Sequence, residues 1–418
     1  MNLIIKSATI LDSKSKHNGS TNDILIENGI ITQIASTIEN TNNYETISHE
    51  NLHVSQGWFD SSVSLGEPGF EERETIENGL KTAAKSGFTA IAVNPNANPI
   101  ADTKADIAFL KSNALENIVN LYPIGALTTK SESVDLAELF DMKNAGAIAF
   151  GDYQKAITNP NLLKIALLYA SNFDGLVLSF PQENKIAGKG IVNEGHNSTR
   201  LGLKGIPALA EELQVARDLF LLEYTKGKLH IPTISSAKSV ELIREAKQKG
   251  LNVSCSVAIH NLVMSDDELE EFDTNFKVLP PLRTQNDCKA LLEGIHDGTI
   301  DMVTTDHNPI DVEHKKVEFD NAMYGTIGLE TAFGALQTVL DTEKVIDLLT
   351  AGKDRFGIET SQISVGHKAN LTLFNPEGNY TFTEKHIHST SKNSAFLDKE
   401  LKGTVYGIIH NQQKIDSI

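Results

Sequence analysis

The feature that most constrains this chain is a regular alternation of short β-rich runs with longer helical patterns, from residue 56 to about residue 355. Alternation of this kind favours a parallel sheet covered by helices. Eight strands are predicted, and eight such units indicate a (β/α)8 TIM-like barrel. The predicted strands begin at Trp58, Phe88, Ile118, Ala147, Gly175, Lys228, Asn252 and Asp301.

One of the helical patterns is long enough to predict which side faces the core. In the segment that begins at Pro207, the apolar residues Leu209, Leu213, Ala216 and Phe220 recur at steps of four and three. This spacing is typical of one buried helix face. We therefore expect these four side chains to pack against the barrel.

The two ends of the chain differ from its middle. Residues 1–55 and 358–418 alternate polar and apolar side chains, with turn signals at Asn28-Gly29 and Gly378-Asn379. We expect the two ends to form together one small β-sandwich domain. The barrel would then occupy residues 56–357, between the two parts of a discontinuous domain.

Composition excludes several classes of function. A formal net charge of −18 repels phosphate backbones and anionic lipid, which disfavours nucleic acid and membrane partners. No apolar run approaches the roughly 20 residues of a membrane helix, and the first residues lack the apolar core of a secretory signal. We expect a soluble, cytoplasmic protein in which the two cysteines, Cys255 and Cys288, are buried thiols.

Several long motifs resemble bacterial dihydroorotases of the amidohydrolase superfamily, in the same order along the chain. They are the segment from Gln56 to Pro99, including Glu67-Pro68-Gly69 and Pro95-Asn96, and the later segments GLKGIPALAEELQVARDL, FKVLPPLR, LLEGIHDGTIDMVTTDHNP and YGTIGLETA. The resemblance covers most of the chain. It implies a barrel of the metallo-dependent hydrolase type and an ancestry in de novo pyrimidine biosynthesis, with zinc as the cofactor of active members.

The resemblance also implies which positions once bound metal. In the family, the first barrel strand carries Asp-x-His-x-His-x-Arg, whereas this chain reads Asp60-Ser61-Ser62-Val63-Ser64-Leu65-Gly66. The later histidine ligands are likewise replaced by hydroxyl residues, and two aspartates remain. The family's metal-ligand positions correspond here to Ser62, Ser64, Asp152, Ser179, Thr233 and Asp306.

Serine and threonine hydroxyls are poor substitutes for the imidazole and thiolate donors that zinc prefers, so we expect no bound metal. Without the metal no hydroxide forms near neutral pH. Asp306 would then be a vestigial catalytic group and Asn96 a vestigial substrate contact. The family's other substrate contacts correspond to Gly66, Leu279 and Ile310, none of which can play that role.

Each polar residue of this set also has a purely structural interpretation. Asp306 with His307 could be a buried hydrogen-bonded pair at a strand end, and Asp152 a turn or cap residue. His230 and His260 are expected to be structural histidines. The hydroxyls at the former ligand positions could converge on a water or a small polar ligand, or fill the vacated space together with water.

Three hypotheses for function follow. The first is a non-catalytic dihydroorotase homologue that acts as an assembly partner of aspartate carbamoyltransferase and forms a homo-oligomer, as the resemblance implies. The second is an active dihydroorotase that interconverts N-carbamoyl-aspartate and dihydroorotate with atypical metal ligands. The third is a small-molecule binding module that uses the residual pocket.

Overall fold

The computed structural model describes residues 1–417, and over these residues eight parallel strands form one sheet. The sheet closes into a barrel because the backbone N–H of Ser64 donates to the carbonyl of His307 over 2.7 Å, which joins the first strand to the last. The predicted barrel is confirmed. Its strands are β6 (Trp58–Val63), β7 (Phe88–Val93), β8 (Asn120–Gly125), β9 (Ala149–Phe150), β10 (Val177–Leu178), β13 (Leu229–Ile231), β14 (Val253–Ala258) and β15 (Met302–Thr304).

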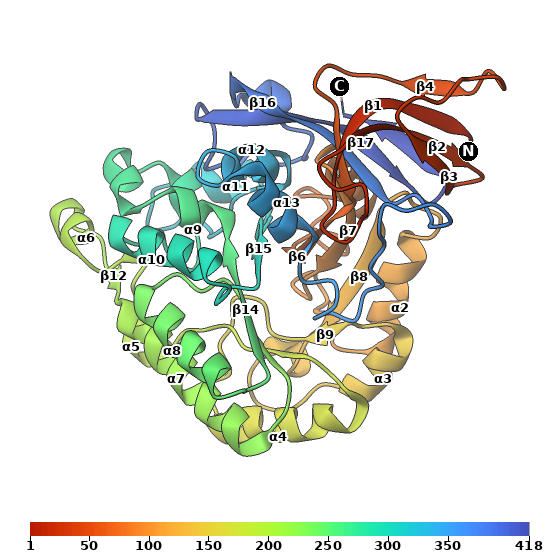
Figure 1. Cartoon of the computed structure of the whole chain (residues 1–418). Coiled ribbons are helices and arrows are strands. Elements are labelled where there is room, and N and C mark those ends of the chain that lie inside the picture. Colours follow the sequence, from red (N-terminus) through yellow and green to blue (C-terminus); the bar gives the residue numbers. More distant parts are fainter. Residues whose placement is uncertain (418) are drawn as a thin grey trace.

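A helix follows each barrel strand and covers the outside of the sheet (Figure 1). Several of these helices begin where a side chain accepts a backbone N–H of the first turn, as at Thr75, Ser236 and Asp341. No helix within residues 1–417 is both long and apolar enough to cross a membrane. The covering helices are α1 (Ile76–Lys85), α2 (Lys104–Asn113), α3 (Leu139–Ala145), α4 (Pro160–Ala170), α7 (Ala208–Thr225), α8 (Ala237–Gln248), α10 (Gln285–His296) and α13 (Thr342–Thr350).

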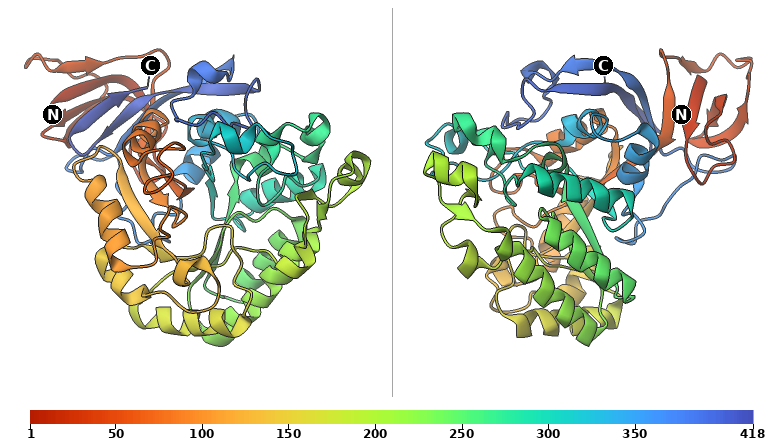
Figure 2. Two further views of the ribbon diagram at one scale, coloured as in Figure 1. Left: turned by 180° about the vertical axis from the view of Figure 1, so that it is seen from behind. Right: turned by 60° about the vertical axis from the view of Figure 1, so that its left-hand side comes forward.

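A second sheet combines strands from both ends of the chain and lies beside the barrel, where the N- and C-termini come together (Figure 2). Strands from the two ends meet where Leu371 pairs with Gln56. The domain bounds expected from the sequence stay a prediction. The strands are β1 (Leu3–Leu11), β2 (Thr21–Glu27), β3 (Ile30–Ala35), β4 (Glu45–Ile47), β5 (His53–Gln56), β16 (Leu371–Thr381), β17 (Glu400–His410) and β18 (Gln413–Asp416).

Of the two turns predicted in this sheet, one is correct and one is wrong. Asn28 and Gly29 both have positive φ and join β2 to β3 in a tight hairpin. Gly378 instead lies inside β16, where the pairing with β17 shifts register between Asn375 and Asn379. A glycine in a strand pattern marks either a turn or such an irregularity, and local sequence does not separate the two.

Short elements fill the connections. The α-helical ones are α5 (Asn184–Ala187), α6 (His196–Leu201), α9 (Ile259–Val263), α11 (Val312–Lys315) and α12 (Ala332–Leu336), and a small parallel pair is formed by β11 (Val192–Asn193) and β12 (Gly205–Ile206). Single 3-10 turns cover Thr129–Ser131, Ser171–Phe173, Asp266–Glu271, Thr274–Phe276, Leu329–Thr331 and Glu384–His386.

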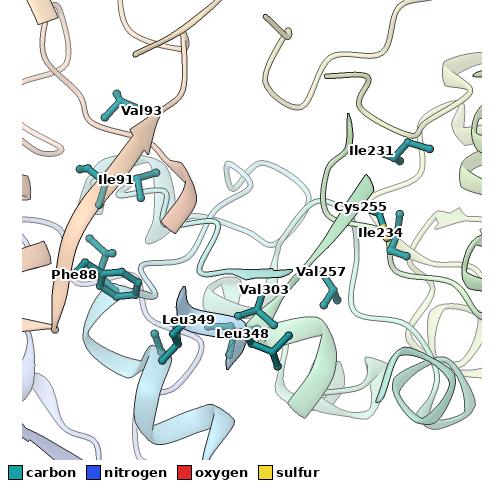
Figure 3. Close-up of a cluster of buried hydrophobic side chains, with 14 of the residues drawn as sticks. Phe88, Ile91, Val93, Ile231, Ile234, Cys255, Val257, Val303, Leu348 and Leu349 are labelled. Carbon is teal, nitrogen blue, oxygen red and sulfur yellow. The ribbon is translucent and has the colours of Figure 1, made fainter. Parts of the chain in front are cut away.

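The main hydrophobic core lies between the barrel sheet and its helices. Ile91 and Val93 of β7 and Leu348 and Leu349 of α13 belong to this one buried cluster, part of which is drawn in Figure 3. Ala90 of β7 points the other way and joins a separate cluster inside the barrel. This alternation is the period of two that a strand imposes, and it leaves the ends of the strands free to carry polar side chains.

The prediction for the orientation of α7 is wrong. Leu209, Leu213 and Phe220 are exposed to solvent, by 49%, 45% and 73% respectively. The buried face of α7 instead carries Val215 and Leu219, among others. The helix has apolar side chains on two faces, so a spacing of three and four residues identifies a stripe without saying which stripe faces the barrel.

Candidate functional site at the barrel mouth

The ends of the barrel strands surround a very small cavity. It leaves about 30 Å³ for water-sized molecules, enough for one or two waters. Small-molecule sites usually offer about 300–1,000 Å³. The cavity is lined by Ser61, Ser62, Asn94, Pro95, Ile124, Gly151, Asp152, Tyr153, Gln154, Leu178, Phe180, His230, Pro232, Thr233, Ser256 and Asp306.

Asp306 lies at the end of β15 and is the central acidic group of the cavity. One carboxylate oxygen accepts a hydrogen bond of 2.8 Å from the Ser62 hydroxyl, and the other lies 3.5 Å from the amide nitrogen of Gln154. Burial raises the pKa of Asp306 from 3.8 to about 7, although the bonds from Ser62 and Tyr153 oppose that rise. The carboxyl is therefore about half protonated at pH 7, whereas an ordinary aspartate is fully ionised there.

Tyr153 and Gln154 occupy the barrel mouth beside Asp306, and the sequence patterns did not identify either of them. The Gln154 amide donates to the Leu279 carbonyl over 2.9 Å and to the Tyr153 hydroxyl over 3.1 Å. Burial and the nearby Asp306 raise the pKa of Tyr153 well above 10, so its hydroxyl stays neutral. In the sequence the segment after β9 offers only Asp152 as a candidate, because a tyrosine and a glutamine are no part of a metal-binding pattern.

Two of the positions that the family resemblance assigns to metal ligands, Ser62 and Ser64, meet a pair of asparagines. The Asn94 amide donates to the hydroxyls of Ser62 at 3.1 Å and Ser64 at 3.2 Å, and the Asn96 amide donates to Ser64 at 3.0 Å. Within the described residues the Asn96 carbonyl oxygen is buried without a partner. Asn96 thus contacts the remnant of the site, while the unpredicted Asn94 lines the cavity itself.

The other two hydroxyl positions do not join this group. Ser179, at the end of β10, donates to the buried carboxylate of Asp218 on α7 over 2.6 Å and does not line the cavity. Thr233 lines the opposite wall, and its backbone N–H donates to Ser256 at 3.2 Å. The four hydroxyls therefore do not converge on one point.

Asp152 holds the loop that follows β8. Its carboxylate accepts the backbone N–H groups of Leu127 at 2.9 Å and Thr128 at 3.1 Å, and the Thr128 hydroxyl at 2.5 Å. These contacts are those of a turn-capping side chain. Both oxygens are engaged by donors of the protein itself.

A second buried aspartate, Asp60 on β6, is bound in the same manner. It accepts the hydroxyls of Thr304, at 2.5 Å, and Thr305, together with the backbone N–H of Thr305 at 3.1 Å. Burial raises the pKa of Asp60 above 3.8, and the threonine hydroxyls oppose the rise. Asp60 ties the first strand of the barrel to the last.

The histidines near the site are neutral. His230 lies between the hydroxyls of Ser254 at 2.9 Å and Ser256 at 3.2 Å, and burial lowers its pKa to about 3. His307 accepts the backbone N–H of Gly328 at 3.1 Å, and burial lowers its pKa to about 4. Asp306 and His307 therefore bind different partners and are not bonded to each other. His260 is also buried, with a pKa lowered to about 4.

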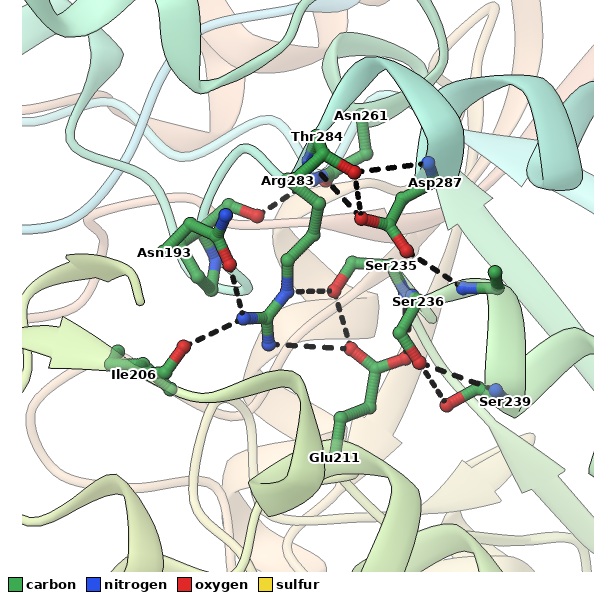
Figure 4. A network of polar contacts seen from close by, with 12 residues as sticks. Asn193, Ile206, Glu211, Ser235, Ser236, Ser239, Asn261, Arg283, Thr284 and Asp287 are labelled. Carbon is green, nitrogen blue, oxygen red and sulfur yellow. Dashed lines mark hydrogen bonds and ion pairs between the residues drawn. The ribbon is translucent and has the colours of Figure 1, made fainter. Parts of the chain in front are cut away.

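A buried ion pair supports the wall behind Thr233. The Arg283 guanidinium lies 3.8 Å from the Glu211 carboxylate (Figure 4). It also donates hydrogen bonds to the Asn193 side-chain oxygen at 2.9 Å, the Ile206 backbone carbonyl at 2.7 Å and the Ser235 hydroxyl at 3.1 Å. Glu211 in turn accepts the backbone N–H of Ser235 at 2.8 Å. These contacts connect α7 and β12 with the loops after β13 and β14.

The three positions at which the resemblance implies substrate contacts in the family are closed in this chain. A Cβ atom added to Gly66 would lie 1.9 Å from the backbone oxygen of Phe70, so the present loop has no room for an arginine. Leu279 packs in an apolar cluster with Phe180 and Ile206. Ile310 is buried as well.

These residues do not fit a zinc ion. Among residues 1–417 there is no group of three or more His, Cys, Asp or Glu side chains that could hold a metal ion. Zinc sites in proteins use three or four such donors. The acidic residues of the mouth already accept hydrogen bonds from serine, threonine and backbone groups.

Comparison with solved structures defines the class of fold. The chain superposes on an L-hydantoinase (dihydropyrimidinase) from Arthrobacter aurescens with a TM-score of 0.86 and 20% identity, covering 99% of this chain and 96% of that one. A D-hydantoinase from Thermus sp. gives 0.82 and 20% identity, with 100% and 96% covered. At this level of identity the likeness concerns the fold, which is that of an amidohydrolase barrel.

Sequence comparison identifies the family within this class. The family model described as Dihydro-orotase-like matches residues 53–239. The chain is 39% identical over 417 residues to the dihydroorotase of Acetivibrio thermocellus, covering 98% of this chain and 97% of that protein. It is 40% identical over 416 residues to the dihydroorotase of Pelotomaculum thermopropionicum, with 98% and 97% covered. The chain belongs to the dihydroorotase-like family.

Proposed function

We propose that this chain is a non-catalytic member of the dihydroorotase-like family, a pseudoenzyme of de novo pyrimidine biosynthesis that acts as an assembly partner of aspartate carbamoyltransferase. One observation carries the first part of this proposal. The cavity at the barrel mouth leaves about 30 Å³, because Tyr153 and Gln154 fill the space beside Asp306. A cyclic amide of dihydroorotate's size does not enter such a space.

The chemistry of the donors supports the same conclusion. A metal-dependent amidohydrolase needs a Lewis acid that generates hydroxide and polarises the amide carbonyl. The former ligand positions now present hydroxyls, and one of them, Ser179, is bonded to Asp218 away from the cavity. The Asp306 carboxyl, about half protonated at pH 7, is a weaker electrostatic partner for a cation than a fully ionised carboxylate.

The backbone around the cavity retains an unusual conformation that the present side chains do not require. Gln154, Thr233 and Asp306 have φ values of 52°, 48° and 46°, in the left-handed region that β-branched residues such as threonine rarely adopt. Strained residues of this kind cost about 1–3 kcal/mol each and cluster at functional sites. Their retention fits a site whose backbone geometry was established before its side chains were replaced.

The choice of aspartate carbamoyltransferase as the partner is based on the resemblance to non-catalytic homologues of the family. A barrel preserved along its whole length around an emptied site is expected where the outer surface is used. The chain covers 97% of the dihydroorotases that it matches, so their overall architecture is retained. Aspartate carbamoyltransferase of the same host is the partner to test.

The alternative is an active dihydroorotase with atypical metal ligands. It requires Tyr153 and Gln154 to leave the mouth and Asp306 to lose its proton when metal binds. Among the described residues, no group of three or more potential metal ligands lies together, and both ring nitrogens of His230, the histidine that lines the cavity, lie against serine hydroxyls.

Two measurements test these proposals separately. Protein purified with zinc in the buffers and then desalted is expected to hold well under one zinc per chain and to leave dihydroorotate unhydrolysed. The Acetivibrio dihydroorotase, treated in parallel, is the positive control. One tightly held ion per chain, or hydrolysis above background, would overturn the non-catalytic proposal. For the partner, we expect co-elution with the host aspartate carbamoyltransferase at micromolar concentration, and separate elution would overturn that part.

A further inference from the structure

An apolar surface lies on the outside of the barrel, far from the cavity. It is formed by the neighbouring helices α4 and α7, which pack against each other on the outer rim (Figure 1). We call this surface the α4/α7 face, and it consists of Ile165 (44% exposed), Leu168 (44%) and Tyr169 (42%) on α4 and of Leu209 (49%), Leu213 (45%), Phe220 (73%) and Tyr224 (75%) on α7, with the half-buried Ala216 between them.

The helices that follow along the rim do not share this character. The outward side of α8 carries Lys238, Glu241 and Glu245, all exposed, and that of α10 carries Lys289 and Glu293. Charged residues on the outward side are the expected pattern for helices that cover a barrel. The preceding helices α2 and α3 each expose one large apolar side chain, Phe109 by 39% and Phe140 by 47%, whereas the α4/α7 face gathers seven. This concentration of apolar residues needs an explanation of its own.

The area of the face matches that of a specific interface. With these exposed fractions, its seven large side chains present roughly 700 Å² of surface. The largest apolar patch of a typical monomer is about 300–600 Å². A stable interface of standard size buries about 800 Å² on each partner. The α4/α7 face therefore supplies most of one half of such an interface.

The sequence of the α7 stripe is self-complementary. Leu209 and Tyr224 lie equally far from the middle of the stripe, and so do Leu213 and Phe220. When two copies of α7 run antiparallel about a two-fold axis near Ala216, each aromatic side chain faces an aliphatic side chain of the other copy. The small side chain of Ala216 then lies at the crossing point, where it allows the helices to approach closely.

The one cationic group in the middle of the stripe is not free to oppose this contact. The Arg217 guanidinium bonds to the Asp218 carboxylate at 2.8 Å and to the Ile157 carbonyl at 2.8 Å. Asp218 is buried beneath the helix, so the charge is directed inward. The centre of the face is thus apolar, as the core of an interface usually is.

We infer that the α4/α7 face is the contact surface between two copies of this chain, related by a two-fold axis near Ala216 with their α7 helices antiparallel. An isologous contact of this kind is the commonest in soluble oligomers, because one surface pairs with itself. The inference does not depend on the proposed function, since the face is remote from the barrel mouth.

The mass of the protein in solution tests the contact. At about 10 µM, light scattering after size exclusion should give twice the chain mass of 45.6 kDa. Phe220→Glu introduces a charge on each side of the axis and should weaken association at least about 100-fold, as substitutions at the centre of an interface do. The control is Leu115→Glu, because Leu115 is 75% exposed, as Tyr224 is, and lies outside the face. This control should leave the dimer intact.

The register has its own test. Leu213→Lys alone and Phe220→Glu alone should both produce monomers, and the double variant should recover association at least about tenfold, because each new cation then faces an anion of the other copy. A monomeric parent protein at about 100 µM would overturn the inference, even if the face then bound aspartate carbamoyltransferase. A dimer unaffected by Phe220→Glu would show that the two copies do not meet through the α4/α7 face. A double variant that stays monomeric would show that the α7 helices are not paired in the antiparallel register.

Discussion

The free energy of unfolding should depend on pH through the buried carboxyl of Asp306 at the barrel mouth. Its pKa is raised from 3.8 to about 7, chiefly because burial disfavours the charged form. In the unfolded chain the same group titrates near its ordinary value of about 3.9. The folded protein thus retains a proton that the unfolded chain has released, and stability falls as the pH rises from about 4 to about 7.

The size of the effect follows from the shift. One pKa unit corresponds to about 1.4 kcal/mol, so the full shift corresponds to at most about 4 kcal/mol, and the part between pH 5 and pH 8 to about 2–3 kcal/mol. Asp306→Asn removes the titration while its side-chain oxygen can still accept the Ser62 hydroxyl. The variant should therefore be more stable than the parent at pH 8, and the advantage should shrink by about 2–3 kcal/mol at pH 5.

Urea unfolding of both proteins at several pH values, in the presence of a chelator, measures this difference. Asp135→Asn is the matched control, because Asp135 is an exposed aspartate outside the site. A variant less stable than the parent at pH 8 would refute the reasoning, since it would mean that the folded state favours the charged carboxylate.

Two further predictions concern the scaffold. Glu211→Gln leaves Arg283 without its buried anion, and we expect urea unfolding to show a free energy of unfolding lower by about 3–5 kcal/mol. The control Lys238→Met breaks an exposed ion pair and should change the free energy of unfolding by less than about 1 kcal/mol. Equal losses in the two variants would contradict the structural role of the buried pair. Burial raises the pKa of Cys288 to about 11 and that of Cys255 still further, so neither thiol should react with a disulfide reagent near pH 8 until the protein is unfolded, and rapid labelling of the folded protein would show that a thiol is accessible.

Much of the architecture could be predicted from the sequence because it depends on local patterns. Each barrel strand, from Trp58 to Asp301, is a short β-rich run bounded by turn signals, and the order of strands and helices then restricts the fold to a few possibilities. The serines Ser62 and Ser64, where the family resemblance leads us to expect histidines, can also be read from the sequence alone. These properties belong to the chain before it folds.

The partners of the polar side chains and the outward face of α7 were decided by the tertiary structure alone. Asp306 meets Ser62 across 244 residues of sequence, and Ser179 meets Asp218 rather than the cavity. Tyr153 fills the barrel mouth only because the end of β9 directs it there. A local pattern specifies which element forms and what it carries, but the contact that a side chain makes depends on which distant segment lies opposite, and only the closed barrel brings those segments together.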